Sequence, residues 1–98
     1  MHLVGAGGAP AAPPALRAMA TTGGVALTWA EVSGAASYRV LRAASAAGPF
    51  ATVGSAPGYA STYTDATVTA GSAYSWRVVA VGDDGVAGAP SPVASATP

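Results

Sequence analysis

Residues 62–81 read TYTDATVTAGSAYSWRVVAV and carry the clearest structural signal in the chain. In the second half of this stretch, Tyr74, Trp76 and Val78 alternate with other residues. Successive side chains of a β-strand point to opposite faces of its sheet, so strict alternation marks one buried face. The stretch therefore predicts a strand over residues 72–81 whose aromatic side chains face a core.

The same period of two recurs upstream of this strand. Val25, Leu27 and Trp29 alternate with smaller residues, and the segment beginning at Tyr38 does the same. Thirteen glycines and eight prolines divide the chain into segments too short for an all-helical fold. Residues 35–47 also have the composition of a helix, but strand neighbours favour a strand there. The pattern predicts an all-β sandwich or barrel of about seven strands, over residues 15–20, 25–30, 37–43, 50–54, 61–65, 72–81 and 91–96.

Several motifs occur in the order and spacing of one known family. They are PALRA at 14–18, VALTW at 25–29, ASYRVLR at 36–42, GPF at 48–50 and the stretch at 62–81. The sequence resembles a fibronectin type III domain over most of its length, which implies an all-β, immunoglobulin-like sandwich of seven antiparallel strands. The SYRVLR, GPF and YTDATV segments are similar to the bacterial members found as modules in secreted enzymes that degrade polysaccharides and other polymers.

This resemblance implies a non-catalytic module that acts as a spacer or accessory domain of a secreted bacterial enzyme. The expected location is extracellular, and the expected partners are neighbouring domains of a parent polypeptide, such as a glycoside or polyester hydrolase. Two alternatives remain open, because a fold does not fix a function. One is a module that binds the surface of an insoluble polysaccharide or other polymer. The other is a protein–protein interaction domain acting through the loops at 31–36 and 82–89.

The spacing around Tyr74 agrees with this family. Tyr74 follows Val68 by six residues, which matches a tyrosine corner, whose phenol bonds to backbone a few residues upstream. Val68 is expected beneath that corner, and Asp65 is expected to end its strand by bonding to the following backbone. Trp29 is expected between the two sheets, against Tyr38 and Tyr74. The predicted core comprises Leu27, Trp29, Tyr38, Val40, Val68, Tyr74, Trp76 and Val78.

Composition excludes several classes of protein. The 98-residue chain has no cysteine, and its four cationic residues balance four acidic ones. Disulfide scaffolds, cysteine-ligated metal centres and thiol catalysis are therefore excluded. So few cations cannot form the basic patch that nucleic-acid binding requires. No segment reaches the ~18 apolar residues of a membrane span, so neither nucleic acid nor a membrane is expected as a partner.

Residues 1–13 differ in composition from the rest of the chain. They are rich in glycine, alanine and proline and lack periodicity, which predicts a flexible tail or linker before a fibronectin type III-like domain at 14–98. They also lack the charged region and the uninterrupted apolar region of a secretory signal. Secretion is therefore expected only as part of a larger protein.

No catalytic residue, metal site or cofactor is expected. His2 is the sole histidine and has no partner at ligand spacing. The Asp83–Gly85 stretch favours a plain turn over a calcium loop, because calcium takes roughly six to eight oxygen ligands. Glu31 and Asp65 would have to flank a sugar cleft to act as a glycosidase pair, and the predicted strands imply no such cleft.

One candidate interaction surface is predicted on the outer side of a sheet. Arg39 and Arg77 are expected to face outward on adjacent strands, together with Leu41, Val79 and Val81. Arginine beside exposed apolar residues can mark a protein or glycan contact. Tyr59, in a predicted loop, is a further candidate, because an exposed aromatic ring can stack on a sugar.

Overall fold

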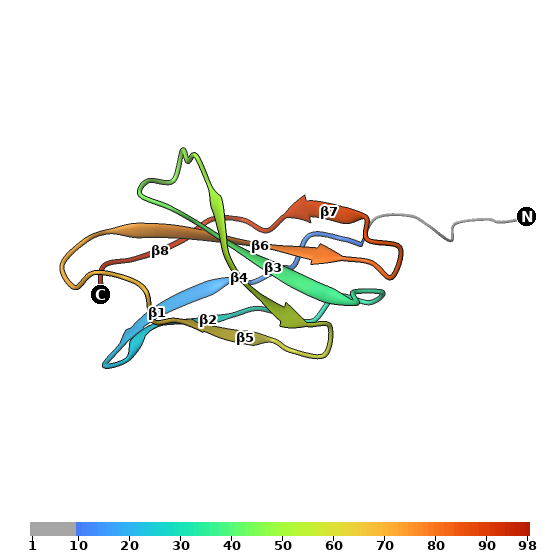
Figure 1. Cartoon of the computed structure of the whole chain (residues 1–98), viewed down its shortest axis with the longest axis horizontal. Helices are drawn as coiled ribbons and strands as arrows, with labels where there is room; N and C mark the ends of the chain where they lie inside the picture. The colour runs from blue at the N-terminus through green and yellow to red at the C-terminus, as the bar shows by residue number, and fades with distance from the viewer. Residues whose placement is uncertain (1–9) are drawn as a thin grey trace, which may run out of the picture.

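The fold consists of two antiparallel β-sheets packed face to face (Figure 1). The computed structural model describes residues 10–98, and these contain no helix that could cross a membrane. The predicted all-β sandwich is confirmed. Its strands are β1 (Arg17–Thr21), β2 (Gly24–Thr28), β3 (Ser37–Ala43), β4 (Ala51–Pro57), β5 (Thr62–Asp65), β6 (Tyr74–Val81), β7 (Ala87–Pro90) and β8 (Ala94–Ala96).

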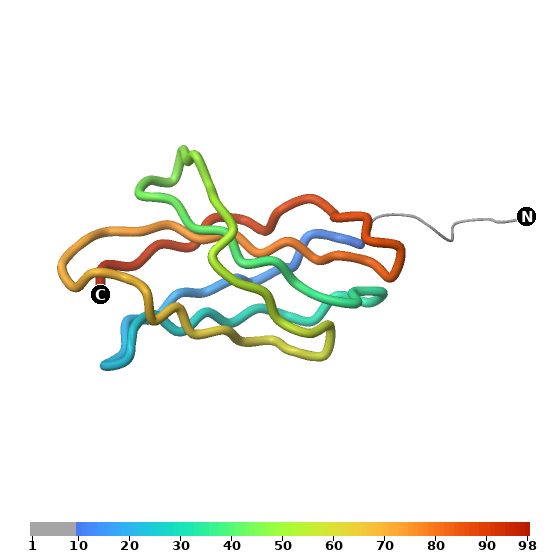
Figure 2. The backbone as a smooth tube through the Cα atoms, in the orientation of Figure 1, coloured from blue at the N-terminus to red at the C-terminus, as the bar shows by residue number. Residues whose placement is uncertain are grey.

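The two sheets differ in size. The smaller sheet has the order β1-β2-β5, and the larger sheet has the order β4-β3-β6-β7, with β8 also paired to β6. Val25 lies opposite Asp65 in the smaller sheet, and Tyr38 lies opposite Ala80 in the larger one. The backbone trace in Figure 2 shows most strands running along the long direction of the molecule and most turns at its two ends, while the loop between β3 and β4 projects to one side. Loops that are far apart in sequence therefore share an end.

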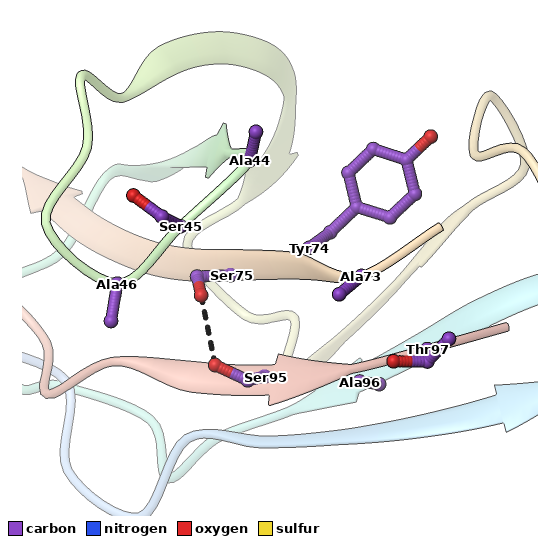
Figure 3. A pocket seen from close by; sticks show the side chains of 9 residues that line it. All are labelled: Ala44, Ser45, Ala46, Ala73, Tyr74, Ser75, Ser95, Ala96 and Thr97. Atoms are coloured by element: carbon purple, nitrogen blue, oxygen red, sulfur yellow. Dashed lines mark hydrogen bonds between the residues drawn. The ribbon is translucent and has the colours of Figure 1, made fainter. Parts of the chain in front are cut away.

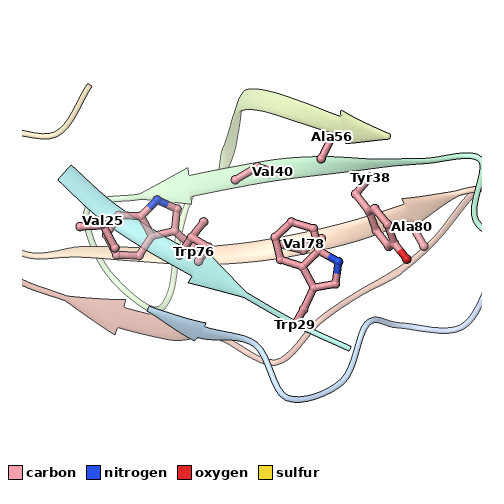
Figure 4. Close-up of a cluster of buried hydrophobic side chains, with 9 residues drawn as sticks. Val25, Trp29, Tyr38, Val40, Ala56, Trp76, Val78 and Ala80 are labelled. Carbon is pink, nitrogen blue, oxygen red and sulfur yellow. The ribbon is translucent and has the colours of Figure 1, made fainter. Parts of the chain in front are cut away.

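The core lies between the two sheets (Figure 4). Val25 and Leu27 project inward from β2 and are fully buried against side chains of β3 and β6. Of the predicted core residues, only Val68 and Tyr74 are half-buried, and both pack against the edge of the cluster. The remaining six are buried as expected, namely Leu27, Trp29, Tyr38, Val40, Trp76 and Val78.

The tyrosine corner is present, but one of its expected contacts is not. The backbone N–H of Thr69 donates to the hydroxyl of Tyr74 at 2.9 Å, as the spacing predicted. Trp29 packs against Tyr38 with ring centroids 5.3 Å apart. The ring of Tyr74 instead lies 5.9 Å from that of Trp76, so its predicted contact with Trp29 is wrong. Tyr74 is at the outer end of the core because it starts β6.

The predicted strand at 91–96 is wrong in its extent, and the sandwich has eight strands instead of seven. The segment AGAP at 87–90 resembles a turn in sequence but forms β7 against β6. The chain then breaks at Ser91, whose backbone N–H donates to the carbonyl of Val78 at 2.8 Å. The Ser91 hydroxyl accepts from the N–H of Val78 at 2.8 Å. Ser91 thus continues the hydrogen-bond ladder to β6 with its backbone N–H and its hydroxyl, between Pro90 and Pro92, which have no N–H to donate.

Residues 10–13, which the sequence assigned to the tail, contact the folded body. Pro13 is fully buried, and the carbonyl of the adjacent Pro14 accepts from the N–H of Ala30 at 3.1 Å. The backbone of Pro10 lies so close to Gly88 that a Cβ there would collide with its carbonyl oxygen. The rest of the predicted tail lies outside the described residues.

Candidate interaction surface

The outer face of the larger sheet carries three of the four predicted surface residues. Arg39 lies opposite Val79 in the β3–β6 register, and Arg77 lies two positions further along, opposite Leu41. Arg39 is exposed, but Val79 and Val81 are each only 7% exposed. Pro90 of β7 pairs with Val79 in the sheet. The expected exposed apolar patch of valines is therefore absent from this face.

Arg77 is also engaged by the protein itself. Its guanidinium carbon lies 5.4 Å from the centroid of the Phe50 ring, a distance at which a cation is attracted to an aromatic face. The loop before β4 brings Phe50 there, and both side chains are half-buried. Within residues 10–98 the buried Nε of Arg77 has no hydrogen-bond partner. Among the residues predicted for this face, Arg39 is thus the one that is exposed.

Tyr59 lies apart from this face, in the turn between β4 and β5. Its side chain is 83% exposed. The N–H of Ala60 donates to the carbonyl of Pro57 at 2.9 Å, which closes the turn, and Gly58 donates to the carbonyl of Ala36 at 3.0 Å. A Cβ on Gly58 would collide with the carbonyl of Ala35, so this glycine permits the close approach of the two loops. The turn therefore holds one exposed aromatic ring, with no second aromatic beside it in sequence.

A surface that sequence reasoning missed lies on the outer face of the smaller sheet. The register places Met19 opposite Ala26 and Arg17 opposite Thr28, and Met19 is 69% exposed. A groove of about 430 Å³ runs between these side chains and is lined by Arg17, Ala18, Met19, Ala26 and Thr28. The sequence signal was available, because Ala26 and Thr28 alternate with the buried Val25 and Leu27 and so must face outward.

A second hollow lies beside the start of β6 (Figure 3). Its volume is about 340 Å³, and its lining is mostly alanine and serine. The hydroxyls of Ser75 and Ser95 lie 2.8 Å apart and bond to each other. The ring of Tyr74 borders the hollow, but the guanidinium carbon of Arg42 lies 4.9 Å from its centroid. The polar groups here are largely used within the protein.

Asp65 has a structural role that its sequence context showed only in part. Its Oδ1 accepts from the N–H of Thr67 at 3.0 Å, which confirms the predicted bond to the following backbone. Its Oδ2 also accepts from Nε1 of Trp76 at 3.1 Å and from Nη1 of Arg42 at 3.0 Å. Burial alone raises the pKa of Asp65, but the hydrogen bonds from Thr67, Trp76 and Arg42 outweigh it and hold the pKa below its ordinary value.

The other candidate carboxylates form no catalytic arrangement with Asp65. Asp65 lies opposite Val25 near the start of β2, whereas the exposed Glu31 follows the far end of that strand. Six residues of extended chain span about 20 Å, beyond the ~5–10 Å separation of a glycosidase pair.

The Oδ1 of Asp84 accepts from the N–H of Val86 at 3.1 Å within a plain turn. Among residues 10–98, no three histidine, cysteine or acidic side chains cluster as metal ligands, and His2 lies outside the described residues.

Comparison with known proteins connects this fold to polymer-degrading enzymes. No family model matches the chain. A poly(3-hydroxybutyrate) depolymerase from Delftia acidovorans is 40% identical over 90 residues, which cover 88% of this chain and 17% of the enzyme. A β-1,2-glucanase from Parabacteroides distasonis contains a similar fold, with a TM-score of 0.82 and 23% identity over 92% of this chain and 13% of that protein. The chain thus spans a small part of each enzyme.

A third comparison covers both proteins almost completely. An Fn3-like protein from Clostridium thermocellum superposes with a TM-score of 0.81 and 35% sequence identity. The match covers 92% of this chain and 95% of the other. Together with the two-sheet sandwich and the tyrosine corner, this similarity shows that the chain belongs to the fibronectin type III family.

Proposed function

We propose that this domain is a non-catalytic spacer or accessory module of a secreted bacterial enzyme that degrades an insoluble polymer. The observation that carries the proposal is the 40% identity to a segment that makes up only 17% of a poly(3-hydroxybutyrate) depolymerase. A segment of that size is one domain of a larger enzyme. The surroundings of Asp65 support a structural role for this carboxylate instead of a catalytic one, because it is buried and hydrogen-bonded to Arg42 and Trp76.

The positions of residues 10 and 98, the two ends of the described part of the chain, suit a spacer. Pro10 lies against Gly82 and Gly88, beside the turn between β6 and β7. The carbonyl of Pro98 accepts from the N–H of Gly71 at 2.7 Å, beside the turn that precedes β6. The two ends therefore lie at opposite ends of the sandwich (Figure 1), separated by at least the length of β6, about 25 Å for eight residues. Domains attached at both ends would be held apart by that distance.

An immunoblot tests this role directly. Antibodies raised against residues 10–98 are used on cells and culture medium of the organism that makes the chain. The expected result is a band in the medium much larger than 9.3 kDa. A band near 9.3 kDa would contradict the spacer role, because the chain would then act alone.

Tyr59 favours a second candidate function, binding of a glycan surface. Its ring is 83% exposed on a turn fixed by backbone hydrogen bonds, and exposed aromatic rings bury large apolar area on contact. Removal of the chain from solution by cellulose or chitin, abolished by Tyr59→Ala, would support this function. No removal at tens of micromolar protein would exclude it.

A further inference from the structure

We infer that the outer face of the smaller sheet binds the surface of a solid polyester. This inference rests on the proposed function and names the polymer that the module would contact. The face is a small grid in which two rows of three side chains lie in register across β1, β2 and β5. The rows consist of Met19, Ala26 and Thr64, and of Arg17, Thr28 and Thr62.

The grid is open to a flat partner. Both β5 threonines are exposed, as are Arg17 and Thr28, and Met19 is 69% exposed. Neighbouring strands are spaced by about 4.8 Å, and alternate residues of one strand by about 6.8 Å. The side chains are short apart from Met19 and Arg17, and the groove between these two extends over Ala26. A flat surface can therefore contact both rows at once.

The chemistry of the grid favours a polyester over a polysaccharide. Poly(3-hydroxybutyrate) carries a methyl group on each unit, and its ester oxygens only accept hydrogen bonds. The face offers methyl and thioether groups from Met19, Ala26 and the threonines, and it offers donors from Arg17 and the threonine hydroxyls. The residues that carry these hydroxyls, Thr28, Thr62 and Thr64, are all exposed. The grid has no carboxylate to repel ester oxygens.

A sugar surface favours residue types that the grid lacks. Sugar hydroxyls are donors as well as acceptors, and sugar rings stack on aromatic side chains. The grid includes neither an aromatic ring nor a carboxylate or amide acceptor. The larger sheet is a poorer candidate for either polymer, because Val79 is buried and Arg77 is stacked on Phe50.

A pull-down with polymer particles tests the inference. The 98-residue chain is mixed with crystalline poly(3-hydroxybutyrate) powder, cellulose and chitin, each blocked with albumin, and the protein left in solution is measured. The polyester powder is expected to remove the chain at tens of micromolar protein, and the polysaccharides are not. Equal removal by all three powders, or by none, would overturn the inference.

A pair of double variants identifies the face that binds. Met19→Glu with Ala26→Glu places two carboxylates in the grid and is expected to weaken polyester binding at least about tenfold, or about 1.4 kcal/mol. The matched control, Thr52→Glu with Ser55→Glu, adds the same charge to exposed positions of β4 and is expected to bind like the wild type. Equal loss in both variants would show a charge effect unrelated to this face and would overturn the inference.

Two further measurements separate the remaining outcomes. If the first variant unfolds, Arg17→Ser with Met19→Ser removes the longest side chains of the grid without adding charge, and unchanged binding would overturn the inference. Analytical ultracentrifugation of the wild type is expected to show a monomer, whereas a dimer lost in the grid variant would assign the face to self-association. The immunoblot is independent of both, so the polyester contact and the accessory role can fail separately.

Discussion

Nη1 of Arg42 lies 3.0 Å from Oδ2 of Asp65, and this ion pair joins the two sheets of the sandwich. Arg42 belongs to β3 in the larger sheet, and Asp65 ends β5 in the smaller one. The Asp65 side chain is 2% exposed and that of Arg42 is 23% exposed. Trp76 and Thr67 donate to the same carboxylate. Four hydrogen bonds therefore converge on one buried charge.

Removing this carboxylate is expected to destabilise the domain strongly. Asp65→Ala removes the charged acceptor of Arg42 and of the indole N–H of Trp76, and breaking a buried pair costs on the order of 3 kcal/mol. The free energy of unfolding is measured by urea titration. Asp83→Ala, in an exposed turn, serves as the control and is expected to have little effect. Equal effects of the two substitutions would contradict a special role for Asp65.

The stability of the domain is expected to fall in acid because of the same residue. The pKa of Asp65 is lowered in the folded protein from its ordinary value of 3.8. Its contribution is therefore complete above that pH and is lost as the pH falls through the lower pKa of the folded state. The unfolding free energy is measured between neutral pH and about pH 2. The Asp65→Asn variant is expected to have a lower unfolding free energy than the wild type at neutral pH, and that free energy is expected to change less as the pH falls. Parallel pH profiles of the wild type and the variant would refute the assignment of the acid sensitivity to Asp65.

Trp29→Ala is expected to leave much of the protein unfolded. Trp29 is 5% exposed and packs on Tyr38, and truncation of a buried aromatic costs about 3–5 kcal/mol. A domain of this size has a total stability of roughly 5–10 kcal/mol. Thermal unfolding followed by circular dichroism measures the loss. An unchanged melting temperature would show that Trp29 is not a core residue, and Tyr59→Ala is the matched exposed substitution.

Ser91→Ala is expected to weaken the junction between β7 and β8. The buried N–H of Val78 donates to the Ser91 hydroxyl, and an unsatisfied buried donor costs about 1–3 kcal/mol. Hydrogen exchange is expected to accelerate at the amide of Val78, and the melting temperature is expected to fall. Ser55→Ala, at an exposed position of β4, should change neither quantity. Unaltered exchange at Val78 in the Ser91 variant would count against the side-chain bridge.

Gly54→Ala is expected to destabilise the contact between β4 and β5. A Cβ at this position would collide with the ring of Tyr63, whose hydroxyl donates to the carbonyl of Val53. Overpacking of this kind costs about 1–3 kcal/mol. Gly23→Ala is the matched control, because no heavy atom lies within 4 Å of its added Cβ. Denaturant unfolding of both variants decides the prediction, which fails if Gly54→Ala is as stable as Gly23→Ala.

The alternation of large apolar residues was sufficient to predict most of the fold. Val25, Leu27 and Tyr38 are buried as expected, because the side-chain period of a strand is local and independent of its partners. The same alternation also places Arg42 on the inward face with Tyr38, since both positions have the same parity. The inward position of Arg42 could therefore be read from the sequence. Its partner Asp65 could be identified only once β3 and β5 had been placed across from each other.

The tertiary structure alone decided which outer faces remain open. Alternation assigned Val79 and Arg77 to an outer face, but it did not show that Val79 is buried there or that the Arg77 guanidinium lies over the ring of Phe50. Alternation separates the two sides of a strand, whereas exposure depends on segments that arrive from elsewhere in the chain. Through local patterning the sequence therefore determined most of the strands, most of the core and the family resemblance, but not β7 or the partial exposure of Val68 and Tyr74. The open grid around Met19, the Arg42–Asp65 pair and the junction at Ser91 required the long-range packing of the two sheets.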